Sequence, residues 1–181
     1  AAAAAVGPSV TLNIAEEAVN GGLPVTVVIA SDQPMPWDTV LSFADSVGNA
    51  YTAVMKSGET ETAVCIQTPV VLNRGTLTYT LSRGDGYQGG AADTIALYPM
   101  PQIEFYQSTY IRKVNSECLI AVTLKRNTLQ EDGEFELRDQ NGETLAALTI
   151  KKNTQLSQFY FKWTPDETQT GRHDLSVWFH G

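Results

Sequence analysis

The sequence contains little histidine and little cysteine. Its 181 residues include two histidines, His173 and His180, and two cysteines, Cys65 and Cys118. A structural zinc site needs closely spaced ligands, and a nucleophilic triad needs a base within hydrogen-bond reach of the nucleophile. These four residues are too scattered for either pattern, so we predict no metal site and no catalytic residues. His173 is expected to be a surface strand residue.

The two cysteines fall in different halves of the chain. A disulfide within one domain is therefore not expected if the chain has two domains. A bridge between domains requires two Cα atoms within roughly 7 Å and stays open as an alternative. The favoured interpretation is that Cys65 and Cys118 are two small buried side chains.

Long apolar runs and basic clusters are also missing. No stretch of about 18 apolar residues occurs, so no membrane insertion is expected. The chain carries 12 Lys and Arg against 20 Asp and Glu, a net charge of -8. A nucleic-acid-binding protein usually presents a basic face, so no nucleic-acid partner is expected. Without an initiator Met or a basic-then-apolar signal region, the sequence is interpreted as a mature or excised fragment.

Short strand-like segments make up most of the first half. They are rich in Val, Ile, Thr and Tyr and are bounded by Gly, Pro, Asn or Asp, as in a β-sandwich. The predicted strands are residues 25–31, 39–45, 61–68, 75–82 and 93–99. In the fourth of these, Leu77, Tyr79 and Leu81 share one face and threonines the other. We therefore expect one buried and one solvent-exposed face, as in an antiparallel sheet.

The second half repeats this pattern. Predicted strands cover residues 118–126, 158–163 and 173–181, and residues 134–150 form a hairpin around Asn141-Gly142. In the first of these strands Cys118, Ile120, Val122 and Leu124 share one face. At least one of Trp163 and Trp178 is expected in the core.

The junction between the halves contains Pro99 and Pro101. Proline has no amide donor, so a central strand is not expected to continue through it. The charge also shifts, from -6 in residues 1–100 to -2 in residues 101–181. We predict an all-β chain of two tandem Ig-like antiparallel β-sandwich domains, residues 9–99 and 100–181. Residues 1–8 are expected to be a linker, a disordered N-terminus or a processed terminus, and whether Ala1–Ala5 is genuine sequence stays open. A single larger sandwich is the alternative.

The first half resembles bacterial surface Ig-like repeats of the Calx-beta-like group. The matching segments are "SVTLNIAE", "LPVTVVIASDQPMPWDTVLSF", "YTAVMKSGETETAVCIQT" and "GTLTYTLSRGDGYQGGAADTIALYP". The resemblance covers about residues 9–99 and implies a structural module. Calcium-binding members carry an acidic run where this chain has Thr68–Gly75, which contains no carboxylate. Since calcium takes six to eight oxygen ligands, no calcium or other cofactor is expected.

The second half more loosely resembles other bacterial Ig-like modules. The features that match are Trp163 and Pro165, followed by Gly171, Leu175 and Val177, which fit the outline of the last two strands. The resemblance implies a second Ig-like module.

Paired carboxylates are the remaining sign of hydrolytic chemistry. They are Glu16-Glu17, Glu131-Asp132 and Asp166-Glu167. A glycosidase needs two carboxylates that face each other across a cleft. Neighbours in turn-like stretches are interpreted instead as solvated residues, so the chain is predicted not to be an enzyme.

Four residues are candidates for binding. Arg83 and Asp85 lie in the tripeptide Arg83-Gly84-Asp85, which resembles the integrin-binding signal of matrix proteins. The surrounding glycines permit positive φ, Asp85 can bond back to the backbone, and Tyr87 is expected to fold inward. The sequence therefore favours a structural loop over an adhesive one. Trp37 and Trp178 are candidates for an exposed carbohydrate platform.

The favoured function is a non-catalytic structural or adhesive segment of a secreted or cell-surface protein. It would act as a spacer and bind protein partners through its edges and loops. The first alternative is a phage virion protein, a capsid, tail or decoration component that self-assembles through flat sheet faces. The second is an accessory carbohydrate-binding module that binds a glycan.

Overall fold

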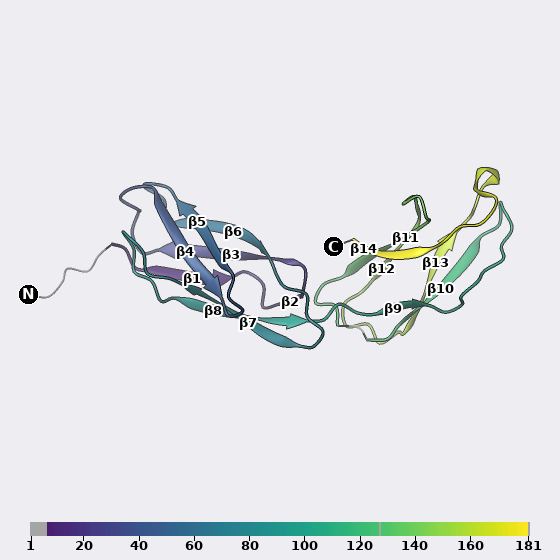
Figure 1. Cartoon of the computed structure of the whole chain (residues 1–181), viewed down its shortest axis with the longest axis horizontal. Coiled ribbons are helices and arrows are strands. Elements are labelled where there is room, and N and C mark those ends of the chain that lie inside the picture. Colours follow the sequence, from purple (N-terminus) through teal and green to yellow (C-terminus); the bar gives the residue numbers. More distant parts are fainter. Residues whose placement is uncertain (1–6, 127, 181) are drawn as a thin grey trace, which may run out of the picture. The chain divides into compact units, whose positions relative to one another are not determined.

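The computed structural model describes residues 7–126 and 128–180. The chain divides into two compact units, residues 1–99 and 100–181. Each unit is a sandwich of two β-sheets (Figure 1). The described residues contain no α-helix. The prediction of an all-β chain with Ig-like antiparallel β-sandwiches is confirmed.

The first unit contains eight strands among its described residues. These are β1 (Val10–Ile14), β2 (Ala18–Asn20), β3 (Pro24–Ser31), β4 (Thr39–Asp45), β5 (Ala50–Met55), β6 (Glu61–Gln67), β7 (Gly75–Leu81) and β8 (Ala92–Tyr98). One sheet has the order β1-β3-β6, and the other has the order β2-β8-β7-β4-β5. All neighbours are antiparallel except β2 and β8, which pair in parallel.

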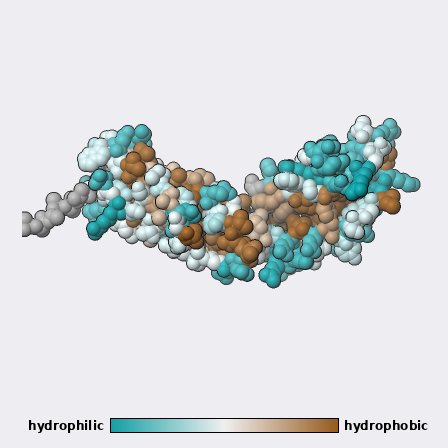
Figure 2. All heavy atoms as spheres, viewed as in Figure 1, coloured by the Kyte–Doolittle hydropathy of each residue, from teal (hydrophilic) through white to brown (hydrophobic). Residues whose placement is uncertain are grey.

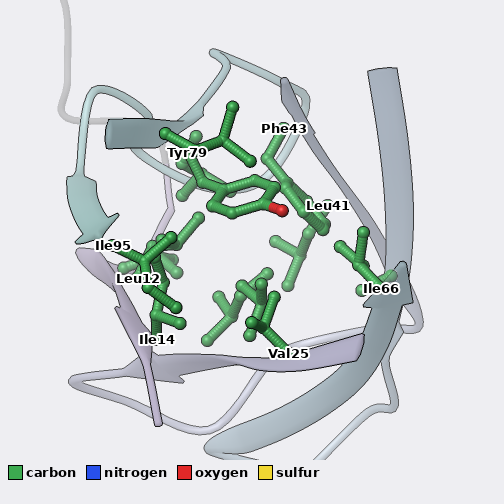
Figure 3. Packing of buried hydrophobic residues seen from close by; sticks show 14 of the residues in the cluster. Leu12, Ile14, Val25, Leu41, Phe43, Ile66, Tyr79 and Ile95 are labelled. Atoms are coloured by element: carbon green, nitrogen blue, oxygen red, sulfur yellow. The ribbon is translucent and has the colours of Figure 1, made fainter. Parts of the chain in front are cut away.

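The core of the first unit follows the alternation of its strands. Leu77, Tyr79 and Leu81 on β7 are at most 1% exposed, which confirms the predicted buried face. They pack with Phe43 of β4 and Ile95 of β8 between the two sheets (Figure 3). Burial of large apolar side chains is the main stabilising contribution in such a sandwich.

The second unit contains six strands among its described residues. These are β9 (Ile103–Phe105), β10 (Cys118–Leu124), β11 (Gly133–Arg138), β12 (Thr144–Ile150), β13 (Gln158–Trp163) and β14 (Ser176–His180). A single 3₁₀ turn, η1 (Glu167–Gln169), lies between β13 and β14. The sheet orders are β13-β10-β9 and β12-β11-β14, with antiparallel pairing throughout.

The core of the second unit is built on β10, whose predicted face is confirmed. Its inward side chains, Cys118, Ile120, Val122 and Leu124, are buried and pack around Phe161 of β13.

Two expectations about buried side chains are wrong. Neither Trp163 nor Trp178 is fully buried, because Trp178 lies on the outer face of β14 and Trp163, at the end of β13, lines a groove. Cys65 is exposed, because Val64 and Ile66 take the inward positions of β6 and leave Cys65 on the outer face.

In the part of the chain that the structure describes, no helix is long and apolar enough to cross a membrane.

Candidate functional site

The loop between β7 and β8 contains Arg83, Gly84 and Asp85. Its anchor is Tyr87, which is buried as predicted and whose hydroxyl accepts a hydrogen bond from the backbone N–H of Ser42 at 3.1 Å. Gly84 pairs with Tyr87 in an isolated bridge, and a Cβ at Gly84 would lie 2.4 Å from the Tyr87 ring. Gly86 has a φ of 85°, a conformation that L-residues with side chains rarely adopt. The loop is therefore shaped by Tyr87 and its glycines.

Arg83 and Asp85 are both exposed. The expectation that Asp85 bonds back to the backbone is wrong, since no hydrogen bond or ion pair joins Asp85 to any residue within 7–126 and 128–180. The bridge between Gly84 and Tyr87 already closes the turn, so the carboxylate is not needed for it.

Trp37 lies beside this loop. Its side chain is 55% exposed, and a Cβ added at Gly86 would come within 2.9 Å of the indole. The backbone carbonyl of Trp37 accepts a hydrogen bond from the Thr39 hydroxyl at 2.9 Å, which fixes the start of β4. The structure thus brings Trp37 together with the loop that carries Arg83 and Asp85.

Trp178 belongs to the other unit, on β14, and is 52% exposed. The Arg138 guanidinium lies 4.7 Å from the centre of the Trp178 ring. The indole N–H donates to the Ser176 hydroxyl at 2.8 Å. A cation over the ring is a stabilising contact. One face of this indole is therefore covered by Arg138, whereas a sugar platform needs an open face.

Asp45 in the first unit holds the turn between β4 and β5. Its Oδ1 accepts hydrogen bonds from the backbone N–H groups of Val47 at 3.1 Å and Asn49 at 2.9 Å. Its Oδ2 accepts from the Tyr51 hydroxyl at 2.8 Å. Burial opposes ionisation of Asp45, but the hydrogen bonds from Asn49, Tyr51 and Val47 outweigh it and lower the pKa of this carboxyl. Burial and the bond to Asp45 raise the pKa of Tyr51 to about 12.

Asp139 plays the same part in the second unit, between β11 and β12. Its Oδ1 accepts from the N–H groups of Asn141 at 2.9 Å and Glu143 at 3.0 Å. Gly142 has a φ of 78° at the position that corresponds to Gly48, whose φ is 100°. The two turns, "DSVGN" and "DQNGE", therefore have the same hydrogen-bonding pattern and the same positive-φ glycine. This repeat was not predicted, although the spacing Asp-x-x-Gly occurs at both turns in the sequence.

His173 is close to Asp139 and is not a surface strand residue, which corrects that prediction. It lies in the loop before β14, with 16% of its side chain exposed. Its Nε2 contacts the carbonyl of Gln169 at 2.8 Å, and its ring packs edge-on against Trp163 at 5.4 Å between centroids. The loop turns inward here, which is why His173 is half-buried.

One carboxylate of each pair in the sequence accepts a hydrogen bond from the backbone or forms a surface ion pair. Glu16 accepts from the N–H of Thr26 at 3.0 Å, and Asp166 caps η1 by accepting from the N–H of Thr168 at 2.8 Å. Asp132 pairs with Lys151 at 2.9 Å. Over residues 7–126 and 128–180, no group of three or more His, Cys, Asp or Glu side chains could hold a metal ion.

A groove of about 970 Å³ opens in the second unit. It is lined by side chains from the end of β9, the segment that follows β9, and the loop before β14, together with Ile120 of β10 and Trp163 of β13. The main apolar lining residues are Phe105, Tyr110, Val114, Ile120, Trp163 and Leu175. No sequence pattern predicts this groove, because alternation predicts which face of a strand is buried and not which neighbours that strand has.

The strand orders of the two units define the chain as a tandem of Ig-like β-sandwiches. No protein-family model matches the chain, and no curated protein matches it. Among solved structures, it is similar to a segment of two fibronectin type III domains from chicken tenascin. The identity is 12% and the TM-score 0.32, with coverage of 94% of this chain and 98% of that chain.

It is also similar to the FN1–FN3 domains of chicken CNTN1. The identity is 10% and the TM-score 0.30, with coverage of 95% of this chain and 59% of that chain. The narrower resemblance to Calx-beta-like bacterial repeats stays a prediction.

Proposed function

We propose that the chain is a non-catalytic structural segment of a secreted or surface-displayed protein. Its two sandwiches act as a spacer and offer surfaces for protein partners. The main support for this proposal is that the side chains suited to acid–base chemistry have structural roles. Asp45 and Asp139 hold turns, Asp166 caps η1, and His173 packs against Trp163.

Other residues form the surfaces available to partners. Arg83 and Asp85 are exposed on the loop beside Trp37, and Trp178 is exposed on β14. Exposed aromatic and arginine side chains are enriched where proteins bind one another. These four residues are the candidate contacts of the proposed function. A glycan as the partner of Trp37 or Trp178 is a further alternative.

One observation favours the virion alternative, in which copies associate through flat sheet faces. Val40 and Val54 are directly paired on the outer face of β4 and β5, and they are 58% and 45% exposed. In the second unit Leu119 and Tyr160 lie on the outer face of β10 and β13 and are also exposed. Exposed apolar side chains on the outer face of a sheet are suited to burial against another copy.

Force spectroscopy tests the spacer role. The 181-residue chain is held by handles at its two ends and stretched. A spacer of two independent sandwiches should give two separate unfolding steps. Phe161→Ala removes a fully buried ring of the second unit and should lower the force of one step only. A single joint step, or no resistance to stretching, would exclude the proposed role.

Sedimentation velocity separates the spacer from the assembly alternative. The spacer proposal expects a monomer at all concentrations. Concentration-dependent association that Val54→Lys abolishes would instead favour self-assembly through the outer face of β4 and β5. Thr52→Lys, on the same outer face of β5 and without an apolar partner, is the matched control, since β5 alternates and Thr52 is exposed.

A further inference from the structure

We propose that the groove of the second unit binds a compact organic anion, an apolar ring or short chain that carries one carboxylate. The aromatic and aliphatic side chains of the groove hold the apolar part of this ligand, and Arg112 pairs with its carboxylate. The inference goes beyond the proposed function, because the ligand is a small molecule and not a protein partner.

The groove has the size and the lining of a small-molecule site. Its volume is about 970 Å³. Ligand pockets in proteins span roughly 300–1,000 Å³ and have mostly apolar and aromatic walls with a few polar groups. Phe105, Tyr110 and Trp163 contribute three aromatic rings to the lining, and Arg112 is one of its polar groups. A compact ligand with an apolar body therefore matches both the volume and the walls.

The two loops that line the groove are tied to each other and to the sheet. The backbone N–H of Asn115, in the segment after β9, donates to the carbonyl of Pro165, in the loop after β13, at 2.6 Å. The Tyr110 hydroxyl donates to the carbonyl of Ala121 on β10 at 3.1 Å and accepts from the N–H of Gln107 at 3.3 Å. These bonds fix the walls before a ligand enters, which lowers the entropic cost of binding.

Arg112 is an exposed cation of this lining that has no counter-ion among the residues described. Its guanidinium lies 5.2 Å from the centre of the Tyr110 ring, so the anchored tyrosine positions it. Within the described part of the chain, its hydrogen bonding is limited to one bond from Nη1 to the Ile111 carbonyl at 2.9 Å. A guanidinium has five N–H donors in a planar fork that matches a carboxylate. Most donors of Arg112 are therefore available to a ligand.

The charge of the groove favours an anion over a cation or a neutral molecule. Its charged lining residues are Arg112, Arg172 and Asp174, and Arg172 pairs with Asp174 at 2.9 Å. Two arginines against one aspartate leave the lining with a net positive charge, with His173 counted as neutral, although the whole chain carries -8. One carboxylate neutralises the remaining charge of Arg112 and can bind it through two parallel hydrogen bonds.

An apolar area on the surface of the second unit adjoins the groove. Hydrophobic residues gather in the strip where Figure 1 places β9 and β14, with hydrophilic residues on both sides (Figure 2). Phe105, the last residue of β9, and Leu175, directly before β14, both line the groove. An exposed apolar area bordered by polar residues marks an interaction site.

Two probes of the same shape test the assignment of an anion. Naphthalene carboxylate and naphthalene carboxamide share an apolar body and differ in charge. Each is titrated into the full chain, and the backbone amides are followed by NMR. We expect saturable shifts confined to residues 105–114 and 163–175, which border the groove. The carboxylate should bind at least about tenfold more tightly than the carboxamide.

Three variants separate the charge of the groove from its apolar wall. Arg112→Gln should weaken binding of the carboxylate about tenfold and leave the carboxamide unchanged. Val114→Asn should weaken both probes to a similar extent, because it makes an apolar part of the lining polar without changing the charge. Arg74→Gln is the matched control and should change neither affinity, because Arg74 lies over the Tyr98 ring of the first unit at 4.9 Å.

Equal affinity of the wild type for the two probes, or equal weakening of both by Arg112→Gln, would overturn the assignment of an anion. Shifts that do not saturate, or that spread over the first unit, would overturn the site itself. Arg112→Lys keeps the charge and should lose less affinity for the carboxylate than Arg112→Gln, which a merely structural role of Arg112 does not require. The two unfolding steps under force do not depend on this ligand. Failure of the groove site is thereby distinguishable from failure of the spacer role.

Discussion

Tyr51 donates a hydrogen bond from its hydroxyl to Oδ2 of Asp45 at 2.8 Å. Its ring lies 6.0 Å from that of Tyr79, whose hydroxyl is buried and has no hydrogen-bond partner among the residues described. Figure 3 shows this oxygen surrounded by carbon atoms of the core. Two tyrosines of the same cluster therefore use their hydroxyl groups in opposite ways.

The first prediction compares these two tyrosines. Tyr51→Phe removes a hydrogen bond to a charged carboxylate and should cost about 1.5–3 kcal/mol of unfolding free energy. Tyr79→Phe removes only an unsatisfied buried hydroxyl and should be neutral or stabilising by up to about 1 kcal/mol. Denaturant unfolding of the first unit measures both. Equal destabilisation by the two substitutions would contradict this interpretation.

The second prediction concerns pH. The pKa of Tyr51 is raised to about 12, so its contribution is fully present below pH 10 and is lost as the pH rises toward 12. The pKa of Asp45 is lowered from 3.8, so its contribution is present above that value and is lost as the pH falls below it. The unfolding free energy of the first unit should therefore decrease at acidic pH, where Asp45 is protonated, and at alkaline pH, where Tyr51 ionises.

Tyr51→Phe is the control for the alkaline side of this profile. The variant should be less stable at neutral pH and should lose less stability than the wild type between pH 10 and 12. An absorbance titration of tyrosinate in the folded protein checks the raised pKa directly. Parallel stability profiles of the two proteins would count against the assignment to Tyr51.

The third prediction concerns the repeated turns. Asp45→Ala and Asp139→Ala each leave two backbone N–H groups of a turn without their acceptor. Each should cost about 2–3 kcal/mol, and each should destabilise only its own unit. Hydrogen exchange on β4 and on β11 reports the two units separately. Asp85→Ala, at an exposed aspartate that bonds to none of the residues described, should leave both strands unchanged.

The sequence allowed the faces of most strands to be predicted but not which strands are neighbours. Leu77, Tyr79 and Leu81 alternate with threonines, and this alternation alone places them in the core. Val177 and Phe179 alternate in the same way, yet they stay partly exposed because β14 has no second neighbour in the described structure. Burial depends on long-range pairing, which local periodicity does not encode.

The exposure of Cys65 could have been predicted from the sequence of β6. β6 contains Val64, Cys65 and Ile66 in succession. Because side chains alternate between the two faces of a strand, either Cys65 faces inward or Val64 and Ile66 do. The larger β-branched residues take the core, and the thiol is left outside.

For the candidate site, the roles of the glycines and of Tyr87 were predictable from the turn chemistry. The contact of Trp37 with Gly86 was not predictable, because it joins segments about fifty positions apart in the sequence.

The fourth prediction follows from this difference between the cysteines. In the folded protein, a thiol reagent should modify Cys65 rapidly and leave Cys118 unmodified. Cys118 is 1% exposed, and burial raises the pKa of its thiol, which lowers its reactivity further. Mass spectrometry after labelling should show one modified thiol in native buffer and two in denaturant. Cys65→Ser should abolish native labelling, and labelling of Cys118 at a similar rate would contradict the structure.

The last prediction concerns adhesion through Arg83-Gly84-Asp85. The Gly84–Tyr87 bridge, the buried Tyr87 and the positive φ of Gly86 account for the shape of this loop without any role for the Asp85 carboxylate. We therefore expect Asp85→Glu to leave both cell adhesion and unfolding free energy unchanged. Gly84→Ala, which places a Cβ against the Tyr87 ring, should destabilise the first unit and serves as the structural control. Loss of adhesion in Asp85→Glu at unchanged stability would show instead that the tripeptide is an adhesive site, because only a partner that reads the carboxylate distinguishes Asp from Glu at an exposed position.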